Sequence, residues 1–303
     1  MRVRLMLWMR TFLVTFAGYF PRPLAGPLSK VLGALAFKLD KRGRRRALRQ
    51  MDMAKVGSDE TERTALIRKM YRHLALTILE TLWISKHMNR ALGFVTFEGT
   101  EHLDAAFAKG KGVVALSMHL GNWELSGVAM GLAYPGTGTI VREQLDDGLD
   151  KILSTSRRQA GLTLFPNTRD QGPAMAMHLA QNRVLGILMD VYASRKHPPI
   201  PFLGVPTPTF VGPADLLRAT GATPLFFHII RLKPYRHVLT ISPIHVSWTQ
   251  DREKDLLEAT TLFNNMISDR IRQHPDQWLW IQKRWKDLSH EEEALKRQEA
   301  QSA

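Results

Sequence analysis

The sequence contains no cysteine. Disulfide bonds, thiolate nucleophiles and cysteine metal ligands are therefore excluded, although a chain without cysteine can lie in any compartment. The metalloprotease pattern H-E-x-x-H, the nucleotide-binding patterns G-x-x-x-x-G-K-[ST] and G-x-G-x-x-G, and the hydrolase pattern G-x-S-x-G are also missing. We therefore expect no metal and no other cofactor, and no covalent acyl-enzyme intermediate.

Acidic residues are scarce at the N-terminus, where residues 1–50 hold twelve Lys and Arg and a single acid, Asp40. Leucines and aromatic residues lie between these cations. A nucleic-acid-binding arm seldom carries so much apolar surface, whereas a segment at an anionic membrane surface needs both kinds of side chain. We predict that residues 1–50 form a basic, amphipathic membrane-anchoring segment, and we expect no nucleic-acid partner.

A long apolar run is missing from the same segment. Its longest uncharged stretch is residues 11–21, well short of the ~20 residues that a membrane-spanning helix needs. Arg10 also interrupts what would be the apolar part of a secretory signal. We therefore expect residues 1–50 to lie in the membrane interface, and export with cleavage is not expected.

The rest of the chain predicts one α/β catalytic domain over residues 51–290 and a polar tail over 291–303. Short apolar runs alternate with helical patterns, which favours a central mixed sheet flanked by helices. Strands are predicted at 94–98, 112–118, 138–141, 162–165, 184–189, 223–230 and 238–242, and helices at 59–89, 103–109, 149–158, 173–181 and 255–273. In such sheets ligands bind beside the carboxyl ends of the strands.

The segment His119-Leu-Gly-Asn-Trp-Glu124 follows the apolar strand at 112–118 directly. Asn122 is a suitable N-cap for the next helix, and Gly121 permits a tight turn that brings His119 and Glu124 together. A histidine whose second ring nitrogen is held by a carboxylate has a fixed tautomer and accepts a proton better at its free nitrogen. The pattern therefore indicates His119 as a general base and Glu124 as the residue that orients it.

This segment resembles the H-x4-D/E motif of the glycerolipid and glycolipid acyltransferases. The form H-[FL]-G-N-W-E is typical of the bacterial lipid A acyltransferases, the lauroyl and myristoyl transferases. The region from Gly204 to Ala222 and the Trp-rich segment from His274 to Lys286 resemble further parts of that family. We expect the Trp-rich segment to be structural.

Asp190 ends the apolar strand at 184–189 and precedes a proline-rich loop, so it is a second candidate at a strand mouth. Most relatives follow this acid with Gln, but here Val191 follows it, which leaves the role of Asp190 open. In the family that the chain resembles, two arginines line the active-site groove. Arg142 and Arg157 match those positions, and arginine suits phosphate or a developing oxyanion because it stays charged.

The resemblance implies an acyltransferase at the cytoplasmic face of the bacterial inner membrane. Its donor would be acyl-ACP or acyl-CoA, its acceptor a phosphorylated glycolipid such as a lipid A precursor, and its third partner the anionic membrane surface. Amides near Gly121, or a nearby arginine, would stabilise the oxyanion; Asn122, Arg142, Arg157 and Asp190 complete the expected substrate-binding set. The alternatives are another glycolipid or aminolipid acceptor, a thioesterase with the same His–Glu pair, and a non-catalytic membrane-binding module.

Overall fold

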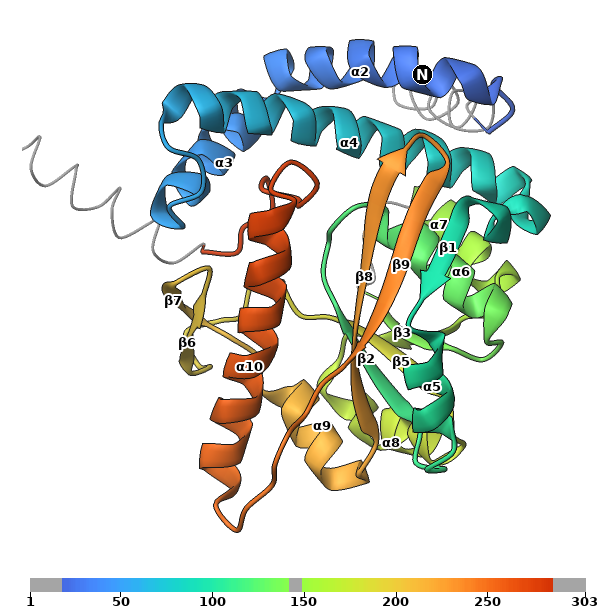
Figure 1. The fold of residues 1–303 in the computed structure, drawn as a ribbon, viewed down its shortest axis with the longest axis vertical. Coiled ribbons are helices and arrows are strands. Elements are labelled where there is room, and N and C mark those ends of the chain that lie inside the picture. Colours follow the sequence, from blue (N-terminus) through green and yellow to red (C-terminus); the bar gives the residue numbers. More distant parts are fainter. Residues whose placement is uncertain (1–17, 142–148, 286–303) are drawn as a thin grey trace, which may run out of the picture.

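The computed structural model describes residues 18–141 and 149–285 as a central sheet covered by helices (Figure 1). Its main sheet consists of β1 (Val95–Glu98), β2 (Val113–Ser117), β3 (Gly138–Val141), β4 (Thr163–Pro166), β5 (Val184–Leu188), β8 (Thr223–Lys233) and β9 (Arg236–Pro243). The helices are α2 (Ala25–Leu39), α3 (Lys41–Met53), α4 (Glu60–Lys86), α5 (Thr100–Phe107), α6 (Trp123–Ala133), α7 (Leu149–Gln159), α8 (Gly172–Ala180), α9 (Gly212–Thr220) and α10 (Arg252–Gln273), with 3-10 turns η1 (Arg22–Leu24), η2 (Met88–Arg90), η3 (Leu92–Phe94) and η4 (Arg169–Gln171).

The strands lie in the order β1-β9-β8-β2-β5-β3-β4. From β8 to β4 neighbouring strands are parallel, whereas β9 runs antiparallel to β8 and carries β1 parallel to itself. The sheet is therefore mixed, and the predicted α/β fold class is confirmed. The carboxyl ends of β2 and β5, neighbours in the sheet, open at the same edge.

Strand β2 is apolar and buried from Val113 to Leu116 because both of its faces are covered. Val113 and Ala115 pack into one core with α5 and α6, and Val114 and Leu116 pack into the other core with α8, α9 and α10. This double burial holds the end of β2, and hence the residue after it, in a fixed position.

Helix α2 lies along α4 at the top of the molecule (Figure 1). Its buried side is a stripe of small residues, Ala25, Ser29 and Gly33. A Cβ atom at Gly33 would lie 2.7 Å from the Cα of Arg72 on α4, so the close approach of the two helices needs glycine. The outer side of α2 exposes the large hydrophobic residues Val31, Leu32, Leu35 and Leu39, and Leu24 of η1 is exposed beside them in the chain. None of the helices in the described ranges is long and apolar enough to span a bilayer.

The proline-rich segment after Asp190 was expected to be a loop, but it contains a second, two-stranded sheet. Strands β6 (Pro199–Phe202) and β7 (Val205–Pro208) pair antiparallel around a tight turn. Leu203 and Gly204 both have positive φ in this turn, as a two-residue hairpin of the primed type requires. The prolines obscured this hairpin in the sequence because they are depleted in strands and reach only edge positions.

Candidate active site

His119 and Asp190 lie side by side because of the register between β2 and β5. Ser117 of β2 is paired with Leu188 of β5, and the amide of Met189 donates to the carbonyl of Ser117. His119 and Asp190 each follow that pair by two residues at the same edge of the sheet. Two residues that are 71 positions apart in the sequence therefore meet at the carboxyl end of the parallel strands.

Asp190 makes two hydrogen bonds to His119, one with its imidazole and one with its backbone amide. The Nδ1 atom of His119 lies 2.8 Å from Oδ1 of Asp190, and the His119 amide donates to Oδ2 at 2.9 Å. A carboxylate can only accept hydrogen bonds, so the neutral imidazole carries its proton on Nδ1. Nε2 is then the basic nitrogen, on a side chain that is 19% exposed beside a fully buried carboxylate.

The Trp-rich C-terminal segment completes the surroundings of Asp190. Nε1 of Trp278 donates to Oδ2 at 2.7 Å, and Nε2 of Gln282 donates to the same oxygen at 3.0 Å. Burial would raise the pKa of Asp190, but the charge of His119 and these hydrogen bonds lower that pKa to about 2. Asp190 is therefore a carboxylate at any physiological pH.

The pKa of His119 is raised by its surroundings. Burial favours the neutral imidazole, but the charge and hydrogen bond of Asp190 and the charge of Glu124 favour the imidazolium more strongly. The site is therefore arranged to stabilise the positive charge that His119 acquires when it takes a proton.

Glu124 does not make the contact that the sequence led us to expect. Its two carboxylate oxygens accept hydrogen bonds from Arg157 of α7, at 2.6 Å from Nη2 and 3.1 Å from Nε. In the described part of the chain, the hydrogen bond to Nδ1 of His119 is made by Asp190 instead. The turn does bring Glu124 near His119, but the neighbouring strand already supplies a carboxylate to the ring. Glu124 contributes its charge to His119 and its hydrogen bonds to Arg157.

Gly121 and Asn122 were expected to contact substrate, but their polar groups serve the turn. The amide of Gly121 donates to the carbonyl of Gln277 at 3.1 Å, so it is not available to an oxyanion. The φ angle of Gly121 is +61°, and a Cβ atom there would lie 2.2 Å from the carbonyl oxygen of Ile229. Asn122 is fully buried, and its Oδ1 accepts from the amide of Leu125 as the predicted N-cap of α6.

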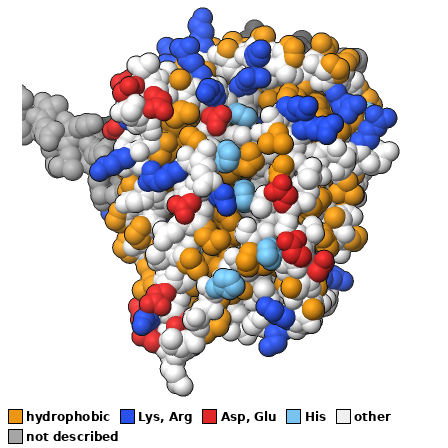
Figure 2. All heavy atoms as spheres, in the orientation of Figure 1, with side chains coloured by type: hydrophobic (Ala, Val, Ile, Leu, Met, Phe, Trp, Pro, Cys, Tyr) orange, Lys and Arg blue, Asp and Glu red, His pale blue; other side chains and the backbone are white. Residues whose placement is uncertain are grey.

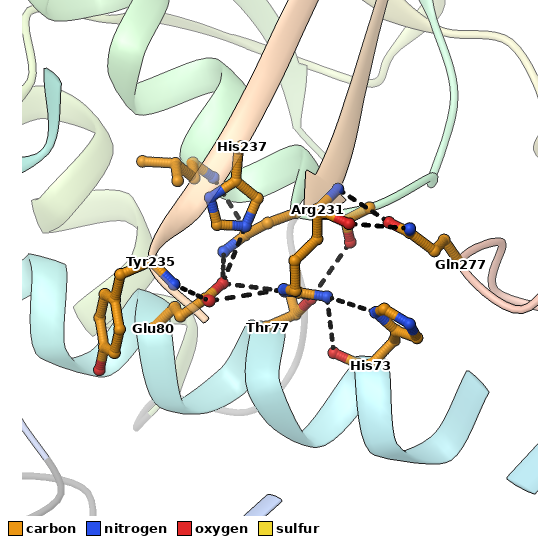
Figure 3. Close-up of polar contacts among 10 residues, drawn as sticks. His73, Thr77, Glu80, Arg231, Tyr235, His237 and Gln277 are labelled. Carbon is orange, nitrogen blue, oxygen red and sulfur yellow. Dashed lines mark hydrogen bonds and ion pairs between the residues drawn. The ribbon is translucent and has the colours of Figure 1, made fainter. Parts of the chain in front are cut away.

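A second buried carboxylate, Glu80 of α4, is hydrogen-bonded to this turn through Asn122. It lies beside Arg231, Tyr235 and His237 (Figure 3). Its Oε2 accepts from Nδ2 of Asn122 at 2.8 Å and from Nη2 of Arg231 at 2.8 Å, and its Oε1 accepts from the amide of Tyr235 at 2.9 Å. Nε2 of His237 lies 3.2 Å from the same Oε2. This cluster was not predicted from the sequence. A signal was present, because Glu80 interrupts the apolar stretch T-I-L-E-T-L-W and Arg231 interrupts the apolar stretch F-F-H-I-I-R-L. An acid and a base inside two apolar stretches indicate a buried ion pair.

An apolar cavity of about 100 Å³ extends from the pair of Glu124 and Arg157 between α6 and the sheet. Met130, Leu162 and Phe227 are among the apolar side chains that line it. This cavity places an apolar space directly beside the polar groups near His119.

Arg142, the other arginine expected in the groove, lies outside the described residues. Within residues 18–141 and 149–285, no group of three or more His, Asp or Glu side chains is placed to hold a metal ion.

The sequence profile described as bacterial lipid A biosynthesis acyltransferase matches residues 1–287. The chain belongs to this family. The match covers nearly the whole chain, so it includes both His119 and Asp190 as well as the basic N-terminal segment.

Individual relatives share about a quarter of their aligned residues with this chain. The phosphatidylinositol mannoside acyltransferase of Mycobacterium tuberculosis is 27% identical over 229 residues, which cover 70% of this chain and 65%, just under two thirds, of the relative. In Escherichia coli, the lipid A biosynthesis palmitoleoyltransferase is 24% identical over 273 residues (88% of this chain, 86% of the relative), and the lipid A biosynthesis lauroyltransferase is 23% identical over 287 residues (92% and 90%).

Proposed function

We propose that this protein transfers a fatty acyl chain from acyl-ACP or acyl-CoA to a hydroxyl group of a phosphorylated glycolipid at the cytoplasmic face of the bacterial inner membrane. A lipid A precursor is the acceptor that the family favours, and the mannoside acyltransferase among the relatives supports another glycolipid as the second candidate. The observation that carries the proposal is the hydrogen-bonded pair of His119 and Asp190 beside an apolar cavity.

In this mechanism His119 is the general base. The acceptor hydroxyl oxygen attacks the thioester carbonyl carbon while Nε2 of His119 takes the hydroxyl proton. Asp190 keeps the tautomer and stabilises the imidazolium. The tetrahedral intermediate then collapses, the carbon–sulfur bond breaks, and His119 returns the proton to the departing thiolate. The enzyme ends in its starting state without forming an acyl-enzyme.

The oxyanion of the intermediate needs donors other than the amide of Gly121. The first amides of a helix have no intrahelical acceptor, so those of Trp123 and Glu124 at the start of α6 are the nearest backbone candidates. Arg157 is the nearest side-chain candidate, since Glu124 fixes two of its guanidinium nitrogens beside the cavity. A phosphate of the acceptor is the other anion that Arg157 suits.

The cavity between α6 and the sheet is suited to the first few carbons of the acyl chain, since its volume is about 100 Å³. Met130, Leu162 and Phe227 are among its apolar lining, and Glu124 and Arg157 are its charged residues. A chain that enters beside these charged residues would hold its thioester carbonyl beside His119. The exposed leucines and cations of α2 would place that opening near the membrane from which the acceptor comes.

The proposal is tested with purified protein, a radiolabelled acyl thioester and a panel of phosphoglycolipids. Acceptor lipid should accelerate thioester consumption and become labelled. His119→Ala should lower the rate by about 10²–10⁴-fold, while the matched variant of an exposed histidine, His245→Ala, should leave it unchanged. Thioester consumption that no acceptor accelerates would replace the transferase with a thioesterase.

A further inference from the structure

A second cavity, separate from the one beside Glu124, lies between η1 and the turn that joins β8 to β9. Its volume is about 420 Å³, and it is open to the surface. Three cationic side chains, Arg22, Lys233 and Arg236, line it together with Phe94 and Tyr235, and no acidic side chain does. Arg22, near the start of the described chain, and the β8–β9 turn, about 210 residues later, therefore form one basic pocket.

The three cations are exposed, and none forms an ion pair with an acidic residue in the part of the chain that the structure describes. The guanidinium of Arg22 is held over the rings of Trp83 at 5.3 Å and Phe94 at 5.5 Å, so its position is fixed without a carboxylate. Like charges gathered around one pocket repel one another, and a bound anion relieves that repulsion.

The turn that carries Lys233 and Arg236 is built rigidly. Tyr235, at its second central position, has a φ angle of +56°, which is unfavourable for a residue with a side chain. The turn keeps this conformation because the Tyr235 ring packs against Trp83 and Phe94 and its amide donates to Glu80. The two cations that flank Pro234 and Tyr235 are therefore held at the pocket rim before any ligand arrives.

Large exposed apolar side chains lie close in the chain to the residues that line the pocket. Leu232 is 69% exposed, Tyr19 64% and Leu24 53%. Figure 2 shows Lys and Arg side chains gathered with hydrophobic ones at the upper part of this face, over α2, α4 and the β8–β9 turn. A site for a soluble anion gains nothing from such neighbours, whereas a site that works at a lipid surface buries them.

The β8–β9 turn lies at the same edge of the sheet as His119. Strand β8 runs parallel to β2, and it continues past the end of β2 to Lys233. Its tip therefore projects beyond the edge that carries His119, toward the side of the molecule on which α4 and α2 lie (Figure 1).

We propose that this pocket binds the headgroup phosphate of an anionic phospholipid, which makes the β8–β9 turn a second membrane contact beside residues 1–50. Arg22 and Arg236 would donate paired hydrogen bonds to phosphate oxygens, and Lys233 would add a point charge. Leu232, Leu24 and Tyr19 would enter the interface around the headgroup. This inference rests on the proposed membrane-docked function, but it concerns binding and can be measured without turnover.

The test is binding of the full chain to vesicles, measured by flotation. Vesicles of phosphatidylcholine alone are compared with vesicles that also contain phosphatidylglycerol. The double variant Lys233→Gln/Arg236→Gln should weaken binding to the anionic vesicles roughly 30-fold, since each cation near such a surface contributes about a factor of five. Lys109→Gln/Lys111→Gln removes the same charge from two exposed residues just before β2, and it should change binding less than about threefold.

A third variant separates a pocket from a diffuse positive surface. Gly93 lines the pocket, and a Cβ atom added there would meet nothing within 4 Å, so Gly93→Glu is sterically allowed. Its carboxylate would occupy the anion's place and should weaken anionic-vesicle binding at least as much as the double variant. Lys111→Gln, with the same change of net charge, is its control.

The proposal is overturned if the pocket variants and their controls bind the vesicles equally. It is also overturned if the pocket variants lose affinity only for inorganic phosphate, or only for an acidic carrier protein, while vesicle binding is unchanged. Inorganic phosphate is also added as a competitor of vesicle binding and compared with chloride at equal ionic strength. If phosphate weakens vesicle binding no more than chloride does, the result supports the lipid headgroup as the source of the bound phosphate. A protein that binds through this pocket but transfers no acyl group would refute only the proposed function.

Discussion

Asp190 and Glu80 are both fully buried carboxylates that accept several hydrogen bonds, yet their partners differ in kind. Asp190 faces His119, which titrates and is 19% exposed. Glu80 instead faces Arg231, which stays charged and is 1% exposed, and His237, which is fully buried. A buried carboxylate can assist a reaction only when its partner both changes charge and reaches the substrate. The first pair meets these conditions, and the second holds together α4, the turn at Gly121 and Asn122, and the β8–β9 turn.

Apart from the loss of His119 itself, the largest effect on catalysis should come from Asp190→Asn. The amide keeps an oxygen for Trp278 and Gln282, but its NH₂ group can donate to Nδ1 of His119 and favour the wrong tautomer. We expect kcat to fall by roughly 10³–10⁴-fold, as it does when a Ser-His-Asp triad loses the carboxylate that orients its histidine. Steady-state rates with a labelled thioester measure this loss, and circular dichroism establishes that the fold is retained. A kcat within tenfold of the wild type would mean that Asp190 does not orient the base.

The largest effect on stability should come from Glu80→Gln. This change leaves Arg231 buried without a compensating charge, which costs about 3–5 kcal/mol and lowers Tm by roughly 10 °C. Thermal unfolding measures it, with the exposed Glu253→Gln as the matched control. The activity of the molecules that remain folded should stay within about tenfold of the wild type. The comparison fails if Glu80→Gln proves stable but inactive.

The sequence was sufficient to predict the strand, turn and helix around His119, because an apolar run, a glycine and an N-cap are local signals. It also placed Asp190 at a strand mouth. The pairing of the two residues was not predicted, because it depends on the register between β2 and β5, which no local pattern specifies. For the same reason we assigned to Glu124 the hydrogen bond to Nδ1 of His119. That bond is made by Asp190, which follows a strand that is distant in the sequence but adjacent in the sheet. The extension of β8 beyond 230 was also missed, since Arg231 interrupts its apolar pattern until Glu80 is known to neutralise it.

A smaller effect is expected at the pair of Glu124 and Arg157, which is partly open to solvent. Arg157→Ala should lower kcat/KM with acceptor lipid by about 10²-fold, while slow thioester hydrolysis persists. Glu124→Gln should cost a similar or smaller factor, because it loosens Arg157 and removes a charge near His119. If the two act as a unit, the double variant should be scarcely worse than Arg157→Ala. Full additivity of the two losses would show that Glu124 works independently of Arg157.

The smallest effect should be a displacement of the pH profile. Neutral His119 is the active base, so kcat/KM should rise with pH through its raised pKa. Glu124 is one cause of that rise, so Glu124→Gln should lower the pKa of His119 and move the acidic limb of the profile to lower pH. Asp215→Asn, which removes a half-exposed carboxylate on α9 that pairs with Arg252, should leave the limb in place. A shift to higher pH would contradict the attraction between Glu124 and the imidazolium.

The pKa shifts of His119 and Asp190 also make the stability of the fold depend on pH. The raised pKa of His119 stabilises the fold fully below its unfolded value near 6.5, and this contribution is lost as pH rises through the folded pKa. The lowered pKa of Asp190 stabilises the fold above its unfolded value of 3.8, and this contribution is lost as pH falls toward about 2. The pair should therefore stabilise most between these limits, where His119 is protonated and inactive. Tm measured against pH should fall on the alkaline side as activity rises, and in His119→Ala this alkaline decline should be smaller.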